Sequence, residues 1–354
     1  MPATLRPRLV NGPFGDPALY VACRHQSRAF LFDCGDLAAL TPGDILKLNH
    51  IFISHTHMDH FCGFDRILRL LLGRDKILRM VGPAGFLSNL EGKLEAYTWN
   101  LVGNYEAGLT IEAMEIDAHK CRTRRYDCRA GFKPRGPDQV AAFDGVLARE
   151  PAFTFSGQVL DHHVPCLGFA LKERFRVNII TQGLRSLNLI PGPWLQEFKS
   201  ALYRQDDPEG TFTIPPAATR EQQPRRVPLK SLTVKISRIT PGMKIAYIVD
   251  AAWTPVNVAR MVALARNADH LYIEAAFAHR HLATARAKAH LTARQAGLVA
   301  AWAAARRLTP IHFSPRYSGA HEALVEEAQA AFRKHFQHPR GKYALTAAGH
   351  GSAQ

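Results

Sequence analysis

The segment FISHTHMDHFCG, residues 52–63, places four side chains that can bind metal within six positions, directly after an apolar run that predicts a strand. These side chains are His55, His57, Asp59 and His60. Alternate residues of a strand share a face, so His55 and His57 can converge on one ion if the chain turns out of the sheet. Asp59 and His60, at the start of the following helix, can then face a second ion roughly 3.5–4 Å away, the separation used by two-metal hydrolytic sites.

Two metal ions need more ligands than one loop supplies, and the ends of other predicted strands carry them. His162 and His163 end one apolar strand, Asp250 ends IAYIVD and His312 ends TPIH. Taken alone, Asp250 would be interpreted as the N-cap of the next helix. In company with the histidines, we interpret it as a ligand. Neutral imidazoles and carboxylates suit zinc, and manganese fits the same ligands.

These ligands must be positioned by apolar strands that alternate with helices. The predicted strands cover residues 28–35, 50–55, 76–82, 109–116, 152–163, 166–173, 243–253 and 270–277. The predicted helices cover FDRILRLLLGR and residues 255–266, 284–307 and 319–335. Two halves of strands with outer helices predict an α/β fold, a four-layer αβ/βα sandwich that forms one domain over residues 1–354.

Two segments interrupt this pattern. Residues 118–150 are polar, basic and punctuated by Gly and Pro, which predicts an irregular basic insertion. Residues 174–230 contain LIPGPWLQEFKSALYR and then the Pro- and Arg-rich TIPPAATREQQPRRVP. They predict a protruding flexible arm, with a short helix after PGP and a flexible return.

The composition is that of a globular protein, and its charge predicts a polyanionic partner. The 354 residues include 45 Lys and Arg against 30 Asp and Glu, which gives a net charge of +15. Clustered cations displace counterions from a phosphate backbone, so nucleic acid is the expected partner. No signal-like apolar segment and no apolar run of about 20 residues is present, so we expect a cytoplasmic protein without a membrane partner. The six cysteines lack zinc-finger spacing and are expected to be free thiols.

The motifs together resemble those of the metallo-β-lactamase-fold nucleases. HTHMDH resembles the HxHxDH of that family, IHFSPRY resembles its last motif, and VDAAW stands where the family has an Asp that bridges two zinc ions. LDHHVPCLGF resembles the third motif and favours His162 over His163. The resemblance implies a metallo-β-lactamase sandwich with two Zn²⁺. One ion would bind His55, His57 and His162, the other Asp59, His60 and His312, with Asp250 between them.

Among these nucleases, the chain resembles the ribonuclease Z type, the tRNA 3′-processing endonucleases. YIEAAF and KAHLTARQAG resemble the family's paired Glu and His motifs, here Glu274 and His290. IPGPWLQEFK resembles the Gly-Pro segment of the arm that grips tRNA. The resemblance assigns substrate contacts to Gly192, Pro193, Lys199 and Arg316.

The resemblance implies an endoribonuclease that removes the 3′ trailer of precursor tRNA by metal-hydroxide attack on the phosphodiester. Asp59 would act as general base, and His290, oriented and kept protonated by Glu274, as general acid. The family also implies a homodimer. Two departures keep an alternative open: LVNGPFGDPALYVAC lacks the family's N-terminal substrate loop, and VDAAW lacks its usual Gly-Asp-Thr. The alternative is a hydrolase of the same fold that acts on a small phosphodiester or other ester.

Overall fold

Two large β-sheets form the body of the molecule in the computed structural model, which describes residues 5–24 and 26–336. The first sheet has eight strands in chain order: β1 Leu5–Leu9, β2 Leu19–Cys23, β3 Ala29–Phe32, β4 Leu48–Phe52, β5 Lys76–Pro83, β6 Leu109–Asp117, β7 Lys120–Asp127 and β8 Gln139–Ala142. The second has six, in the order β18 Leu308–Ile311, β17 His270–Glu274, β16 Lys244–Ile248, β11 Pro165–Glu173, β10 Phe153–Asp161 and β9 Val146–Arg149.

Aromatic side chains fill the space between the two sheets. Phe32 and Phe52 from the first sheet are stacked with ring centroids 5.1 Å apart, and Phe52 lies 4.9 Å from Phe155 of the second sheet. Phe169 and Tyr247 join this fully buried cluster. Large interdigitating rings remove much apolar surface from water, so this layer holds the sheets together.

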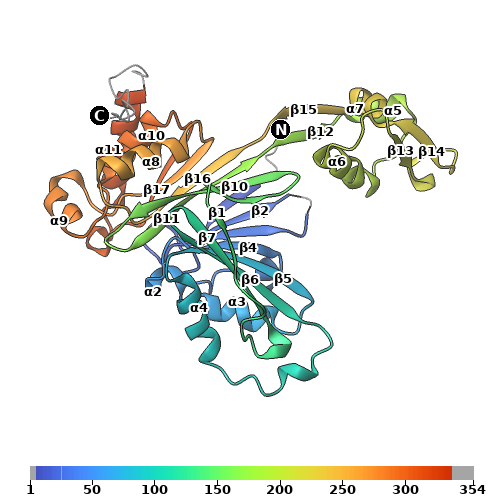
Figure 1. The fold of residues 1–354 in the computed structure, drawn as a ribbon. Helices are drawn as coiled ribbons and strands as arrows, with labels where there is room; N and C mark the ends of the chain where they lie inside the picture. The colour runs from blue at the N-terminus through green and yellow to red at the C-terminus, as the bar shows by residue number, and fades with distance from the viewer. Residues whose placement is uncertain (1–4, 25, 337–354) are drawn as a thin grey trace, which may run out of the picture.

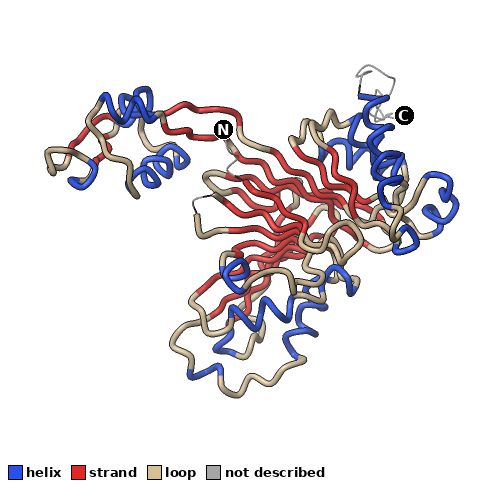
Figure 2. The backbone as a smooth tube through the Cα atoms, turned by 180° about the vertical axis from the view of Figure 1, so that it is seen from behind, coloured by secondary structure: helices blue, strands red, loops and turns tan. Residues whose placement is uncertain are grey.

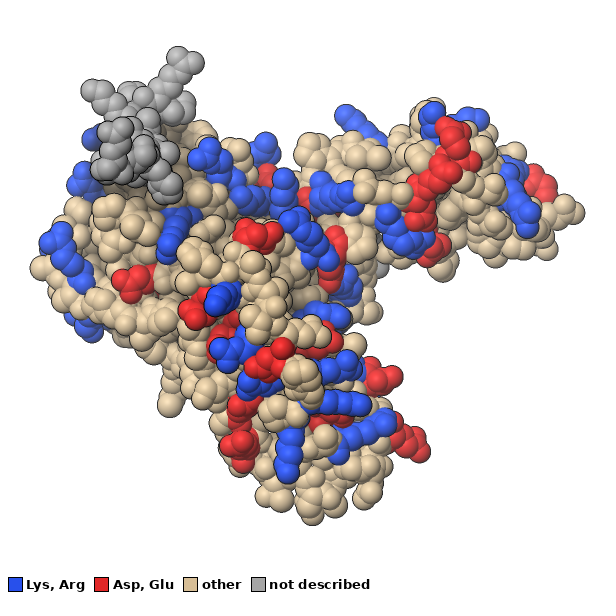
Figure 3. Space-filling model, viewed as in Figure 1, with Lys and Arg blue, Asp and Glu red and all other residues tan. Residues whose placement is uncertain are grey.

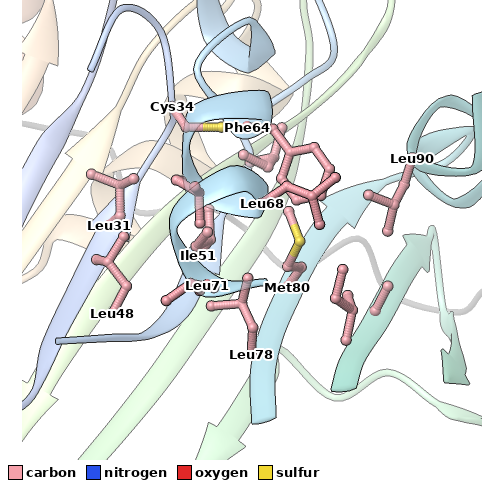
Figure 4. Packing of buried hydrophobic residues seen from close by; sticks show 14 of the residues in the cluster. Leu31, Cys34, Leu48, Ile51, Phe64, Leu68, Leu71, Leu78, Met80 and Leu90 are labelled. Carbon is pink, nitrogen blue, oxygen red and sulfur yellow. The ribbon is translucent and has the colours of Figure 1, made fainter. Parts of the chain in front are cut away.

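Helices cover the outer face of each sheet (Figures 1 and 2). The first sheet carries α1 Pro42–Leu46, α2 Met58–Phe61, α3 Phe64–Leu71 and α4 Phe86–Glu95. The second carries α8 Pro255–Ala265, α9 Leu282–Ala287, α10 Ala293–Trp302 and α11 His321–Phe336. In α3, Phe64, Leu68 and Leu71 recur at helical spacing and pack over strand residues such as Ile51 and Met80 (Figure 4). The order helix, sheet, sheet, helix confirms the predicted αβ/βα sandwich.

The arm leaves the second sheet and projects well beyond it (Figure 1). Its stem is the antiparallel pair β12 Phe175–Ile179 and β15 Ser237–Pro241. The distal part contains α5 Thr181–Ser186, α6 Trp194–Arg204, β13 Thr211–Ile214, β14 Arg225–Pro228 and α7 Leu229–Ile236. The predicted helix after PGP is present as α6, and the arm has an apolar cluster of its own that includes Trp194, Phe198 and Ile214.

Three local predictions were wrong, each for a structural reason. The return of the arm is a β13–β14 hairpin followed by α7 rather than a flexible segment. The segment 118–150 contains β7, β8 and β9 instead of irregular structure. β8 and β9 are edge strands, and few side chains of the three strands are buried, so backbone pairing sets the structure without a clear apolar pattern. The predicted helix 284–307 is broken into α9 and α10, because Ala289 adopts a positive φ of 56° and Thr292 begins a new capping box.

No helix in the described ranges combines the length and the apolar character that crossing a bilayer requires.

Candidate metal centre

The parallel strands determine where the candidate ligands meet. Strand β4 pairs in parallel with its neighbours β3 and β5, and β16, β17 and β18 are parallel to one another. The carboxyl ends of parallel strands lie at one edge of a sheet, and functional side chains of such folds gather there. His55 follows β4, Asp250 follows β16 and His312 follows β18, while His162 comes directly after the antiparallel β10. The end of each strand therefore delivers one ligand to a common place.

All seven predicted metal ligands come together at this edge. One group consists of His55, His57, His162 and Asp250, another of Asp59, His60 and His312, and within each group one ligand atom per residue lies within 4.8 Å of the others. Asp250 is central: its Oδ2 lies 3.4 Å from His55 Nε2 and 3.1 Å from His60 Nε2, and its Oδ1 lies 2.7 Å from His312 Nδ1. His163, which the motif disfavoured, is exposed and belongs to neither group.

The donor atoms fit a bound cation. His60 Nε2, Asp250 Oδ1 and His312 Nδ1 are buried, and none of them forms a hydrogen bond within the described part of the chain. These atoms approach one another closely, as Asp250 Oδ1 and His312 Nδ1 do at 2.7 Å, but without the geometry of a hydrogen bond. Buried polar atoms that lack hydrogen bonds are costly, and a cation would satisfy all three at once. Imidazole nitrogen and carboxylate oxygen are ligands that zinc prefers.

A buried aspartate that sequence reasoning missed supports this centre. Asp33, at the end of β3, accepts hydrogen bonds from the Ser54 amide (2.6 Å), the Ser54 hydroxyl (2.8 Å) and the Tyr247 hydroxyl (2.9 Å). Its Oδ2 also lies 2.9 Å from His60 Nδ1. A proton on Nδ1 leaves Nε2 of His60 free to face Asp250, so Asp33 orients this imidazole for metal binding. His162 is oriented in the same way by the Ala289 carbonyl, 2.9 Å from its Nδ1.

His290 and Glu274 form a pair beside the centre, as their motifs predicted. Glu274 Oε2 lies 2.9 Å from His290 Nδ1, and Glu274 Oε1 accepts a hydrogen bond from the Ala251 amide (2.7 Å). Burial disfavours the charged imidazole, but the carboxylates of Glu274 and Asp250 outweigh it and raise the pKa of His290 to about 10. By contrast, burial lowers the pKa of the ligand His55 to about 2. These shifts favour the protonated form of His290 and the neutral form of His55, the forms that a proton donor and a metal ligand respectively require.

The predicted substrate contacts lie in two places. Arg316, in the turn Pro315–Tyr317 after His312, has its guanidinium 5.1 Å above the Phe277 ring, which lines a pocket at the centre. Gly192, Pro193 and Lys199 lie in the arm, at the start of α6 and within it, and the structure does not bring them to the metal centre.

Comparison with known proteins finds relatives that align with almost the whole chain. No protein-family model matches. Over 331 residues the chain is 30% identical to the ribonuclease Z of Deinococcus radiodurans, covering 92% of this chain and 95% of that one. It is 28% identical over 313 residues to the ribonuclease Z of Bacteroides fragilis, covering 87% and 86%. The metallo-β-lactamase fold protein YhfI of Bacillus subtilis superimposes with a TM-score of 0.50, covers 92% of each chain at 16% identity, and confirms the fold.

Proposed function

The chain belongs to the ribonuclease Z family of metal-dependent, metallo-β-lactamase-fold hydrolases, and we propose that it removes the 3′ trailer of precursor tRNA with two zinc ions. The observation that carries this proposal is the seven-ligand centre with the His290–Glu274 pair beside it. The centre supports hydrolysis, and the pair supports a leaving group that must be protonated.

The ligand groups suggest how two ions would be held. His55, His57 and His162 would bind one, Asp59, His60 and His312 the other, with Asp250 shared between them; manganese is compatible with the same atoms. When bound, the ions would supply a hydroxide near neutral pH and neutralise charge that develops on the phosphate oxygens.

The chain's own residues would move the protons. Burial opposes ionisation of Asp59, but hydrogen bonding to His312 and His60 holds the pKa of this carboxyl below its ordinary range. Asp59 is thus ionised, and its side chain is 45% exposed, so an attacking water could reach it and we assign it the role of general base. His290 would donate a proton to the leaving 3′-oxygen, and Glu274 would fix the direction of the ring.

A direct experiment tests the proposed reaction. The purified protein with zinc is incubated with a 3′-extended precursor tRNA and both product ends are mapped. We expect one cut after the discriminator nucleotide, with a 3′-hydroxyl on the tRNA and a 5′-phosphate on the trailer. Intact RNA together with fast turnover of a small phosphodiester would favour the alternative, a small-ester hydrolase.

Replacement of His290 by asparagine should separate proton donation from metal binding. Loss of a positioned general acid typically costs 10²- to 10⁴-fold, so we expect cleavage of precursor tRNA to fall on that order with zinc content unchanged. Hydrolysis of an aryl phosphodiester should fall much less, because nitrophenolate leaves without protonation. Equal losses on both substrates, or loss of zinc, would contradict the assignment of His290 as acid.

The position of the arm supports a homodimer. Its stem ends at Pro241, and β16 then runs from Lys244 to Ile248 before reaching Asp250. The arm and the metal centre therefore lie at opposite ends of β16. An RNA gripped by the arm would have to span the sheet to reach the same subunit's centre, whereas a second copy could present its centre directly.

A further inference from the structure

Two separate pockets share His290 as a lining residue. The first has a volume of about 320 Å³ and includes Asp59 and His312, so it opens on the metal centre. The second, of about 410 Å³, is lined by none of the seven ligands. It lies against the loop that follows Asp250 and against α9. The two pockets therefore adjoin each other at His290, the proposed proton donor.

Each pocket has one cation that is not engaged by the protein. Lys288 lines the first pocket and Arg286 the second, and both side chains are exposed. Neither forms a side-chain hydrogen bond or ion pair with a residue in the described ranges, whereas Arg124 and Arg204 are each held by two carboxylates. The five residues 286–290 therefore place a free cation in each pocket and His290 in both. Free cations in neighbouring pockets can bind phosphates of one strand.

Each pocket also has a partly exposed aromatic ring. Phe14 lines the first, and its ring is held edge-on by Phe313 at 5.5 Å. The turn that carries it is tied down by the Phe313 amide, which donates to the Pro13 carbonyl (2.8 Å). Trp253 lines the second, supported by Trp302 at 6.1 Å and an angle of 35°. Aromatic side chains fixed in this way act as stacking surfaces for nucleobases of any sequence.

We propose that these pockets are the two nucleotide subsites that flank the scissile phosphate. One flanking base stacks on Phe14 and the other on Trp253, while Lys288 and Arg286 bind the adjacent phosphates. The inference rests on the proposed function, and it assigns roles to Phe14 and Trp253, which stand in the two segments that depart from the family's motifs. Stacking also explains how the site would accept trailers of any sequence.

Abasic substrates test the stacking directly. Trp253→Ala and Phe14→Ala are assayed on precursor tRNA and on two versions that lack one base, either the last retained or the first removed. Each variant should lose on the order of tenfold in kcat/KM on intact RNA, as stacking typically contributes. On the substrate that lacks the base it stacks on, each variant should have the same kcat/KM as the wild-type protein. The substrate that shows this equality should differ between the two variants. A loss that persists on both abasic versions would overturn the proposal.

Arg286→Gln provides a test that leaves the packed aromatic rings untouched. It should raise KM for RNA and reduce the salt slope of RNA binding by about one unit, because one phosphate contact is lost. Arg280→Gln is the matched control, since Arg280 is exposed and lines neither pocket. Tyr97→Ala, at a 46% exposed ring after α4, is the aromatic control. If wild-type protein cuts RNA and the pocket variants match these controls, the inference fails alone; if wild-type protein cuts no RNA, the proposed function fails with it.

Discussion

Zinc binding and RNA cleavage are both expected to disappear when His57 is replaced by alanine. His57 is a candidate ligand of the first ion, with its Nδ1 2.8 Å from His55 Nε2. A bound ion typically stabilises a hydrolytic transition state by several kcal/mol, so cleavage should fall by on the order of 10³-fold or more. Metal content after dialysis, measured by mass spectrometry, and the cleavage rate check the expectation together.

This ligand separates metal loss from unfolding better than its neighbours do. His57 is exposed at the N-cap of α2 and makes no capping hydrogen bond, whereas His55, His60 and Asp250 are buried. The melting temperature without added metal should therefore change little. His119→Ala, at an exposed histidine in the β6–β7 turn, is the matched control and should keep both zinc and activity. A variant at His57 that remains active without metal would refute the assignment of the centre.

The clustering of the candidate ligands could be predicted from the sequence because its signal is local. A His or Asp that directly follows an apolar strand must lie at the sheet edge, and parallel strands bring such edges together. Asp33 carries the same signal in LFDCGD, yet its role could not be predicted from it. That role depends on the opposite nitrogen of His60 and on Tyr247, which is distant in sequence and reaches Asp33 only across the two sheets.

The features that were mispredicted depend on interactions that a sequence pattern does not encode. Strand β8 is exposed along its whole length, so it shows no alternation of apolar and polar residues, and pairing with β7 sets its conformation. The helix predicted across residues 284–307 has continuous helical composition. The helix breaks at Ala289 and restarts at Thr292. The restart is held in place by Phe277, whose carbonyl accepts from the Ala293 amide (2.8 Å). That break is what places His290 beside Glu274.

Basic residues lie on both the sandwich and the arm, which favours binding of one RNA at both places. In Figure 3, Lys and Arg side chains are spread over the sandwich and the arm and are interrupted by Asp and Glu. Residues 175–241 contain ten Lys and Arg against five Asp and Glu. Within the described arm, Arg225 and Lys230 are paired with carboxylates, while Arg185, Arg226 and Arg238 are exposed and have no ion pair. The arm therefore offers free cations far from the metal centre.

Removal of the arm is expected to abolish cleavage of precursor tRNA while small phosphodiesters are still hydrolysed. Ile179 and Ser237 are register partners in the stem, so residues 180–236 can be replaced by an Asn-Gly turn without moving β12 or β15. Loss of a second attachment point typically costs 10²- to 10⁴-fold in apparent affinity, and kcat/KM for precursor tRNA should fall accordingly. The centre at the other end of β16 keeps all of its ligands, so turnover of an aryl phosphodiester should persist.

The comparison of the two substrates decides what the arm does. The deleted segment supplies most of its own apolar cluster, so its removal should leave the sandwich folded, which thermal unfolding can verify. A charge-reversed arm, with Arg185, Arg226 and Arg238 changed to Glu, is the matched variant that keeps the arm folded and should reproduce much of the loss on RNA. Because phosphate contacts release counterions, both variants should also show a weaker dependence of cleavage on salt. If the deletion lowered kcat/KM equally for RNA and for the small diester, the arm would support the structure of the metal centre rather than bind the substrate. If RNA cleavage were unchanged, the arm would have no role in RNA binding.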